Sequence, residues 1–251
     1  MVQDSSREKN LINLVGLTRK ELENVVKRLG FKPFRGRQIW HWIYHRGAKS
    51  FEEMTTLAKD ARVELAKKCL ITRPLIMNEK LSKDKTRKWL LRVEGGGEVE
   101  TVFIPEDDRG ALCISSQVGC ALSCTFCHTG TQPLVRNLSP ADVVGQILVA
   151  RDVYGEWPSR MGGRLLTNVV MMGMGEPLLN YENVARALGI VMDNEGISIS
   201  KRRITLSTAG CGFASELWHL YAVFGVLTPI GLALVGSPLI NPTINNWFYK
   251  Y

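Results

Sequence analysis

The sequence predicts an α/β protein in which an incomplete (β/α) barrel follows a small helical N-terminal domain. Strand and helix patterns alternate three times at roughly 40-residue spacing, as in βα units around a parallel sheet. The expected strands and helices of the barrel cover 111–116, 141–154, 165–172, 181–193 and 202–207. Amphipathic helical patterns before them predict the N-terminal domain. Because about three βα units do not close a barrel, we expect an exposed sheet edge and poor solubility.

The helical N-terminal domain is assigned to residues 1–72. Its first helix begins with a capping box of Thr18 and Glu21, continues through apolar residues at helical spacing and ends at Gly30. Two further short helices are expected over 51–70, where Cys69 is interpreted as a buried, unreactive thiol. Residues 1–10 contain no apolar segment of a signal peptide, so we expect a cytoplasmic protein.

Positive charge is concentrated in this N-terminal part. The formal net charge is +8, and residues 1–90 contain 21 Lys and Arg against 10 Asp and Glu. Residues 27–49 combine seven basic residues and five aromatic rings with no acid. Basic groups neutralise phosphates and exposed rings stack on bases, so the segment favours RNA binding. For the rings alone we favour a place in the core, because Trp40 and Tyr44 lie one helical turn apart.

A β-hairpin extension is expected over residues 73–108, between the helical domain and the barrel. Its strands cover 75–79, 87–93 and 98–104, and three consecutive glycines form the turn between the last two. The barrel is assigned to 109–210. Its first strand leads directly into a cysteine-containing loop, and functional loops of barrels follow strands in this way.

Three cysteines of that loop, Cys120, Cys124 and Cys127, have C-x3-C-x2-C spacing. Four ligands would complete a zinc site or saturate an iron-sulfur cluster, whereas three leave one iron of a cubane cluster open to a small molecule. Two alternatives use the same residues. The sequence CTFCH also fits covalent haem attachment, which requires export, and a zinc site would need His128, which directly follows Cys127 and is poorly placed to complete the tetrahedron. The open cluster is the favoured interpretation.

A second candidate segment, Gly173 to Pro177 (GMGEP), follows the second barrel strand. Glycines let a ligand approach the backbone, whose amide and carbonyl groups can hold a charged amino group. Alone, the segment would be interpreted as a tight turn with a solvated Glu176. Its place one βα unit after the cysteine loop favours a cofactor site, and Ser207 ends the third strand at the same edge.

Both segments resemble those of the radical S-adenosylmethionine (SAM) enzymes. Three stretches narrow the resemblance to one subfamily. They are EVETVFIPEDDRGALCISSQVGCALSCTFC from Glu98, NVVMMGMGEPLLN from Asn168 and SKRRITLSTAG from Ser200. Similarity extends over about residues 10 to 210. The three stretches are similar to the radical SAM methyltransferases that methylate C2 of adenine in 23S ribosomal RNA and in transfer RNA. Adenine C2 is electrophilic and has no acidic proton, so a polar methyl transfer from SAM has no nucleophile to use.

The resemblance implies a role for each matching residue. Cysteines 120, 124 and 127 would hold a [4Fe-4S] cluster, and Gly175, Glu176 and Ser207 would contact SAM. Glu100 would accept the C2 proton, and Cys113 would release the methylated RNA by forming a disulfide. Without the resemblance, Glu100 would be interpreted as a solvated strand carboxylate and Cys113 as a small buried strand residue.

The resemblance also implies partners: 23S rRNA and tRNA as substrates, and a reductant such as flavodoxin or ferredoxin. We expect a monomer without membrane contact. A noncatalytic RNA-binding protein that retains an iron-sulfur cluster is the alternative function.

Residues 211–251 differ from the rest of the chain, because they contain one acid, one lysine and eight aromatic residues. Similarity to the family ends where this segment begins, and a reading-frame shift near Gly210 is our hypothesis for the change. The family's methyl-accepting cysteine lies further downstream, and Cys211 is wrongly placed for that role. We therefore expect no methyl transfer by this chain. Residues 220–240 are uncharged over the length of a membrane span, but their prolines and glycines make a poor helix.

Overall fold

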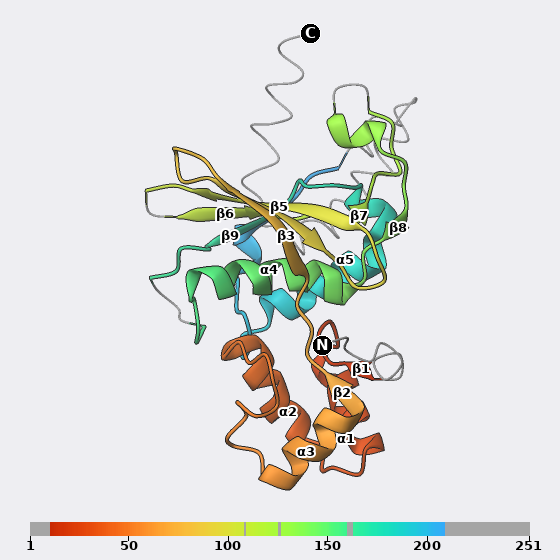
Figure 1. Cartoon of the computed structure of the whole chain (residues 1–251), viewed down its shortest axis with the longest axis vertical. Coiled ribbons are helices and arrows are strands. Elements are labelled where there is room, and N and C mark those ends of the chain that lie inside the picture. The colour runs from red at the N-terminus through yellow and green to blue at the C-terminus, as the bar shows by residue number, and fades with distance from the viewer. Residues whose placement is uncertain (1–10, 108, 125–126, 160–162, 209–251) are drawn as a thin grey trace.

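The computed structural model describes residues 11–107, 109–124, 127–159 and 163–208. A helical N-terminal domain lies below a mixed β-sheet, and two long helices lie between them (Figure 1). The expected α/β class, with a helical domain ahead of alternating strands and helices, is confirmed. No helix among the described residues combines the length and the apolar character that crossing a membrane requires. The uncharged segment 220–240 lies outside the described residues.

The N-terminal domain consists of α1 (Arg19–Arg28), α2 (Phe34–Trp40), the π-helical turn η2 (His41–His45) and α3 (Lys59–Lys68). Strand β1 (Ile12–Asn13) pairs in parallel with β2 (Cys69–Leu70) and closes the domain. The predicted capping box of α1 is present, with the Thr18 amide donating to Glu21 Oε2 at 2.8 Å. The prediction of two helices over 51–70 is wrong. Only α3 forms there, and the Glu53 carboxylate accepts from the amides of residues 49 and 50 and holds the preceding segment in turns.

The structure confirms the predicted core position of the rings for Trp40 and Tyr44 but not for Phe34, which is 47% exposed. Trp40 is 2% exposed and Tyr44 is fully buried, so both belong to the core. Most of the basic side chains of the segment, including Lys27, Arg28 and Lys32, are exposed. The core therefore contains Trp40, Trp42 and Tyr44, and most of the charges lie at the surface, where RNA contact stays a prediction.

A six-stranded sheet with the order β10-β9-β6-β5-β4-β3 forms the second part of the molecule. Its antiparallel half is built from β3 (Leu75–Leu81), β4 (Arg87–Arg92) and β5 (Glu98–Pro105), and β5 pairs with β6 (Gly110–Cys113). The predicted hairpin extension is thus continuous with the barrel sheet. Strands β9 (Asn168–Met171) and β10 (Ile204–Leu206) continue the sheet in parallel from β6.

Helices α4 (Pro140–Tyr154) and α5 (Tyr181–Met192) cover one face of this sheet (Figure 1). Residues 142 to 151 of α4 are all buried, because the sheet lies on one side of the helix and the N-terminal domain on the other. Gly16 shows how close the two parts approach, since a Cβ there would lie 2.4 Å from the Ala141 amide nitrogen. The buried apolar side chains from Leu14 to Ile204 form one continuous core.

The opposite face of the sheet is the open face. Along β5, Val99, Thr101 and Phe103 are buried against the helices, whereas Glu98, Glu100 and Val102 alternate with them and are only half-buried. The register places Val102 opposite Cys113 of β6. Both candidate catalytic residues therefore lie on the open face.

Candidate active site

The candidate residues gather at the edge of the sheet where the parallel strands β6, β9 and β10 end. Beyond β6, the chain forms β7 (Gln117–Val118), the cysteine loop and β8 (Arg136–Asn137), which pairs with β7. Beyond β9 it forms the glycine-rich turn and the 3-10 turn η4 (Pro177–Asn180). In barrels of this kind the carboxyl ends of the strands carry the active site.

Ser115 connects the glycine-rich turn to β5. Its hydroxyl donates to the Glu100 carbonyl oxygen at 2.7 Å and accepts from the Met174 amide at 2.9 Å. The Glu100 amide in turn donates to the Met174 sulfur at 3.4 Å. Gln146 of α4 fixes the backbone of Ser115, because the Gln146 side chain forms hydrogen bonds with both the amide and the carbonyl group of Ser115. The backbone of Glu100 is thereby fixed against the glycine-rich turn.

Gln117 connects the glycine-rich turn to the cysteine loop. Its side-chain oxygen accepts from the Ala121 amide at 3.2 Å and from the Glu176 amide at 2.9 Å. Its side-chain nitrogen donates to Asn137 Oδ1 at 2.7 Å. Gln117 is fully buried, so water does not compete for these bonds. One carboxamide thus sets the position of both candidate binding segments.

The cysteine loop is anchored at its ends. Gly119 has a φ of 74°, and a Cβ there would lie 2.0 Å from the Pro133 carbonyl oxygen. The Cys120 amide donates to the Gln132 carbonyl at 3.2 Å, and the Cys127 amide donates to that of Cys124 at 3.1 Å. All three cysteines are free and half-buried. Among the described residues, no three His, Cys, Asp or Glu side chains are grouped to hold a metal ion, so the thiols do not converge in this structure.

The glycine-rich turn packs directly on Gln117. Gly175 has a φ of 96°, and a Cβ there would lie 2.5 Å from Gln117 Cβ, so only glycine fits. Glu176 is 5% exposed, and its carboxylate accepts from the Leu178 amide at 3.1 Å and the Thr208 hydroxyl at 2.7 Å. Ser207 is exposed at the same edge, and its amide lies 3.4 Å from the Met171 carbonyl. Three strands therefore contribute to this end of the site.

Glu100 and Cys113 are diagonal neighbours on the open face, because Cys113 faces Val102 across the β5–β6 pair. Burial raises the pKa of the Cys113 thiol above its ordinary value. Glu100 forms an ion pair with Lys88 of β4, and both side chains are a little over two-fifths exposed. Glu100, Cys113 and Lys88 therefore share the open face of the sheet, which is accessible to a ligand.

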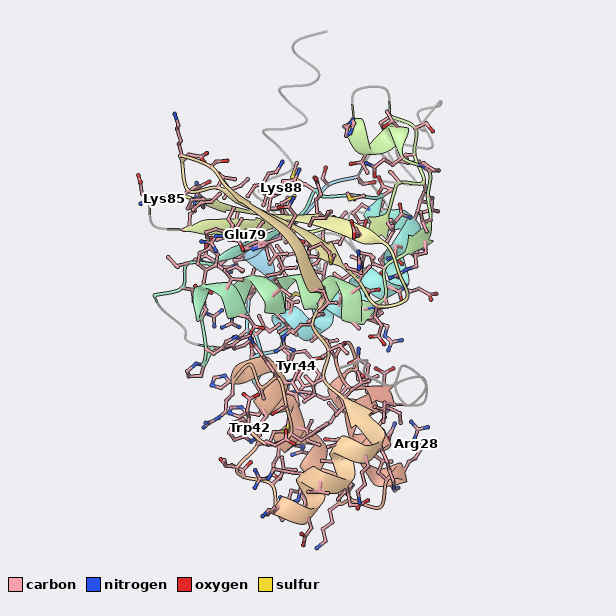
Figure 2. All side chains as sticks on the ribbon, viewed as in Figure 1. Arg28, Trp42, Tyr44, Glu79, Lys85 and Lys88 are labelled. Atoms are coloured by element: carbon pink, nitrogen blue, oxygen red, sulfur yellow. The ribbon has the colours of Figure 1, made fainter. Side chains whose placement is uncertain are left out.

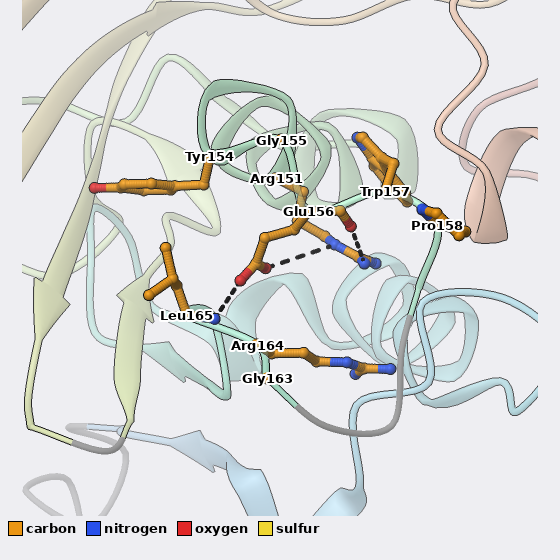
Figure 3. A pocket seen from close by; sticks show the side chains of 9 residues that line it. All are labelled: Arg151, Tyr154, Gly155, Glu156, Trp157, Pro158, Gly163, Arg164 and Leu165. Atoms are coloured by element: carbon orange, nitrogen blue, oxygen red, sulfur yellow. Dashed lines mark hydrogen bonds and ion pairs between the residues drawn. The ribbon is translucent and has the colours of Figure 1, made fainter.

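A cavity of about 210 Å³ lies at the other edge of the sheet, beyond the end of α4 (Figure 3). Its wall contains Arg151, which is 2% exposed, lies 4.0 Å from the Trp157 ring centroid and donates to Ser159 Oγ at 2.7 Å. Burial lowers the pKa of Arg151 to about 10, with Arg164 adding to the effect. None of the candidate catalytic, cofactor or cluster residues lines this cavity, so it is separate from the candidate site.

A partial barrel with a three-cysteine loop after its first parallel strand defines a radical SAM domain. Residues 114–227 match the radical SAM superfamily, to which this part of the chain belongs. Residues 12–71 match the ribosomal RNA large subunit methyltransferase N-terminal domain. The resemblance predicted from the motifs is confirmed for both the N-terminal domain and the partial barrel.

Curated relatives of this chain are RNA methyltransferases, a narrower group than the radical SAM superfamily. The chain is 60% identical over 200 residues to the dual-specificity RNA methyltransferase RlmN of Rhodospirillum rubrum, covering 79% of this chain and 47% of the relative. It is 59% identical over 202 residues to the protein of the same name from Gluconobacter oxydans, covering 79% and 50%. A crystal structure of a radical SAM methyltransferase from Sphaerobacter thermophilus superposes with a TM-score of 0.71 at 41% identity, covering 79% of this chain and 57% of that one. The chain spans about half the length of the curated relatives it matches.

The sequence patterns do not reveal Ser115, Gln117 and Thr208, which connect the candidate segments. Ser115 and Thr208 are polar residues just beyond a strand, and Gln117 lies in the two-residue strand β7, which is too short to show a hydrophobic period. Their partners lie as many as 59 positions away in the sequence. In the sequence, only their position near strand ends could have indicated these residues. That position does not distinguish a residue that connects two segments from one that is solvated.

Proposed function

We propose that residues 11–208 form the SAM-cleaving and RNA-recognising part of a methyltransferase that acts on C2 of adenine in 23S rRNA and tRNA. The observation that carries this proposal is the joining of the cysteine loop and the glycine-rich turn by the buried Gln117. It places a candidate cluster loop beside a candidate SAM-binding turn. The exposed cations of the N-terminal domain supply a surface that attracts RNA phosphates.

The donor set of the cysteine loop fits a [4Fe-4S] cluster. Cys120, Cys124 and Cys127 are unpaired thiols on one short loop, and thiolates are the ligands that such clusters use. Metal binding is coupled to the ordering of its ligands, so cluster binding would draw the three thiols together. When bound, the cluster would supply the electron that cleaves SAM. Backbone groups of the turn at Gly175, which is half-buried, would hold the amino group of SAM as part of the same proposal.

Two side chains on the open face are assigned to the RNA. Glu100 would take the proton from adenine C2 after a carbon has bonded to C2, since the proton is not acidic before that addition, and its fixed backbone limits the directions in which the carboxylate can point. In the whole methyltransferase Cys113 would release the product by attacking the sulfur of the cysteine joined to the RNA, so that a disulfide forms as the bond from that sulfur to the RNA carbon breaks. The raised pKa of Cys113 keeps this thiol protonated until a base removes the proton. No cysteine of residues 1–251 is assigned as methyl acceptor, so we expect SAM cleavage without RNA methylation.

Anaerobic reconstitution tests the proposal. Purified chain treated with iron and sulfide, then with dithionite and SAM, should contain about four iron atoms per chain and release 5′-deoxyadenosine. The triple Ala variant of Cys120, Cys124 and Cys127 should bind no cluster and release none. Cys69→Ala, which removes a buried thiol from the other domain, is the matched control and should behave as the unmodified chain. Equal iron content in the two variants would refute the cluster assignment, and a loaded chain that does not cleave SAM would support the noncatalytic RNA-binding alternative.

The reductant, the oligomeric state and the cellular location are also part of the proposal. A flavodoxin or ferredoxin would reduce the cluster in the cell, and the chain would act as a monomer in the cytoplasm. Reduction of the loaded cluster by purified flavodoxin, followed by its electron paramagnetic resonance signal, tests the first point. Light scattering at several concentrations tests the second.

A further inference from the structure

A hairpin rich in lysine continues the open face beyond the candidate site. The register pairs Lys80 of β3 with Lys88 of β4, Lys88 with Val102 of β5, and Val102 with Cys113 of β6. Directly paired residues point to the same face of a sheet. Lys80 and Lys88 therefore stand in one row with Cys113, and Glu100 is the diagonal neighbour of both Lys88 and Cys113.

The cations of this hairpin exceed its acids. Residues 80–88 contain five Lys and Arg and one acid, Asp84, whose carboxylate is bonded to the amide and hydroxyl of Thr86. Arg87 is neutralised on the covered face, where it pairs with Glu79 at 2.9 Å. Among the described side chains, no ion pair forms with Lys80, Lys83 or Lys85, and all three are exposed. Figure 2 shows Lys85 on the hairpin and Lys88 closer to the middle of the sheet.

The direct pairing of Lys80 with Lys88 is unfavourable by itself. Like charges on directly opposite residues of neighbouring strands repel each other and destabilise the pair. The Glu100 carboxylate relieves this repulsion only in part, because one acid faces two ammonium groups. An anion placed between the two lysines would complete the balance of charge.

We propose that the β3–β4 hairpin binds the phosphate backbone of the RNA substrate, with Lys80 and Lys88 holding a phosphate beside the adenine and Lys88 shared with Glu100. The inference rests on the proposed function, since it assumes that the substrate is RNA. An ammonium group has three donors, so Lys88 can bond to a phosphate as it loosens its bond to Glu100. Arrival of the RNA would thereby release the carboxylate that the proposed reaction uses as a base. Neighbouring strands lie about 4.8 Å apart, so Lys88 and Cys113, two strands apart, fall within the reach of one nucleotide and one lysine side chain.

The salt dependence of RNA binding tests the phosphate contacts. Binding of a fluorescent stem-loop RNA to the full chain would be followed by anisotropy between about 50 and 200 mM salt. The double variant K80Q/K88Q should bind more weakly and should reduce the magnitude of the slope of log K against log salt by about 0.7, because the two lysines hold one phosphate between them. Lys201→Gln removes an exposed lysine from the turn before β10 and should leave the slope unchanged. A double variant with the slope of the unmodified chain overturns the proposal.

A second experiment tests whether Lys88 is shared between Glu100 and the RNA phosphate. Glu100→Gln should raise RNA affinity, because it removes a carboxylate that competes with the phosphate for the same ammonium group. The increase should disappear when Lys88→Gln is already present. An equal increase in both backgrounds would show that Lys88 is not shared. If the unmodified chain fails to bind RNA, the proposed function fails with the inference, whereas RNA binding with an unaltered salt slope overturns the hairpin contact alone.

Discussion

Replacing Gln146 with leucine should destabilise the chain far more than its small change in shape suggests. Gln146 is fully buried, and its side chain accepts from the Thr101 hydroxyl at 2.9 Å and the Ser115 amide at 2.8 Å. It also donates to the Ser115 carbonyl at 3.0 Å. Leucine leaves these three buried groups without that partner. At about 1.5 kcal/mol for each group, the loss is about 4.5 kcal/mol.

Urea unfolding followed by tryptophan fluorescence measures this loss. A loss of about 4.5 kcal/mol is a large part of the 5 to 15 kcal/mol that stabilises a typical domain, on the order of half of the middle of that range. Gln132→Leu, at an exposed position of the cysteine loop, is the matched control and should change stability by less than about 0.5 kcal/mol. Thr101→Val removes one of the three bonds and should cost about 1 kcal/mol. If Gln146→Leu costs less than about 1 kcal/mol, the assigned bonds do not support Ser115.

Three other perturbations give separate tests. Asp152→Ala leaves the nearly buried guanidinium of Arg73 without its carboxylate, 3.1 Å away, and should cost about 3 kcal/mol in urea unfolding; a change near zero would show that this contact between the two parts of the molecule is unimportant. Gly175→Ala forces a side chain into a left-handed turn at a cost of about 1 to 3 kcal/mol, and SAM binding by the reconstituted chain, measured by equilibrium dialysis, should weaken at least about tenfold; unchanged binding would place SAM elsewhere. Burial lowers the pKa of both His41 and His45, with nearby positive charge adding to the effect, so stability should be full above about pH 6.5 and should fall as the pH drops from there toward the folded pKa; thermal melts of the double Gln variant should lose this dependence, and melts that keep it would assign it to other groups.

Helices α1 and α4 were predictable because their signals are local, whereas only one of the two helices expected over 51–70 forms. The capping box at Thr18, the one at Ser139 and the left-handed Gly155 at the end of α4 each involve residues a few positions apart. Strand ends were less predictable. The first barrel strand was expected to continue to residue 116 but ends at Cys113, because Ser115 turns its amide to the side chain of Gln146 instead of to a neighbouring strand.

The candidate site was predictable only as a set of separate segments. Cysteine spacing and glycine content mark the loop and the turn, and the family resemblance assigned Glu100 and Cys113. Nothing in a linear pattern indicates that Gln117 joins the loop to the turn, because a buried carboxamide and a solvated one have the same letter. The convergence of the thiols was not predictable from the chain alone, since the ligand itself supplies the attraction that would bring them together.

The burial of α4 on both sides has a consequence for how the protein unfolds. Its apolar residues belong at once to the sheet core and to the contact with the N-terminal domain, so neither part holds a complete interior of its own. We expect heat to melt residues 11–208 in a single cooperative transition. A fragment that starts after residue 72 would leave one flank of α4 bare to water, and such a fragment should aggregate or need a chaperone.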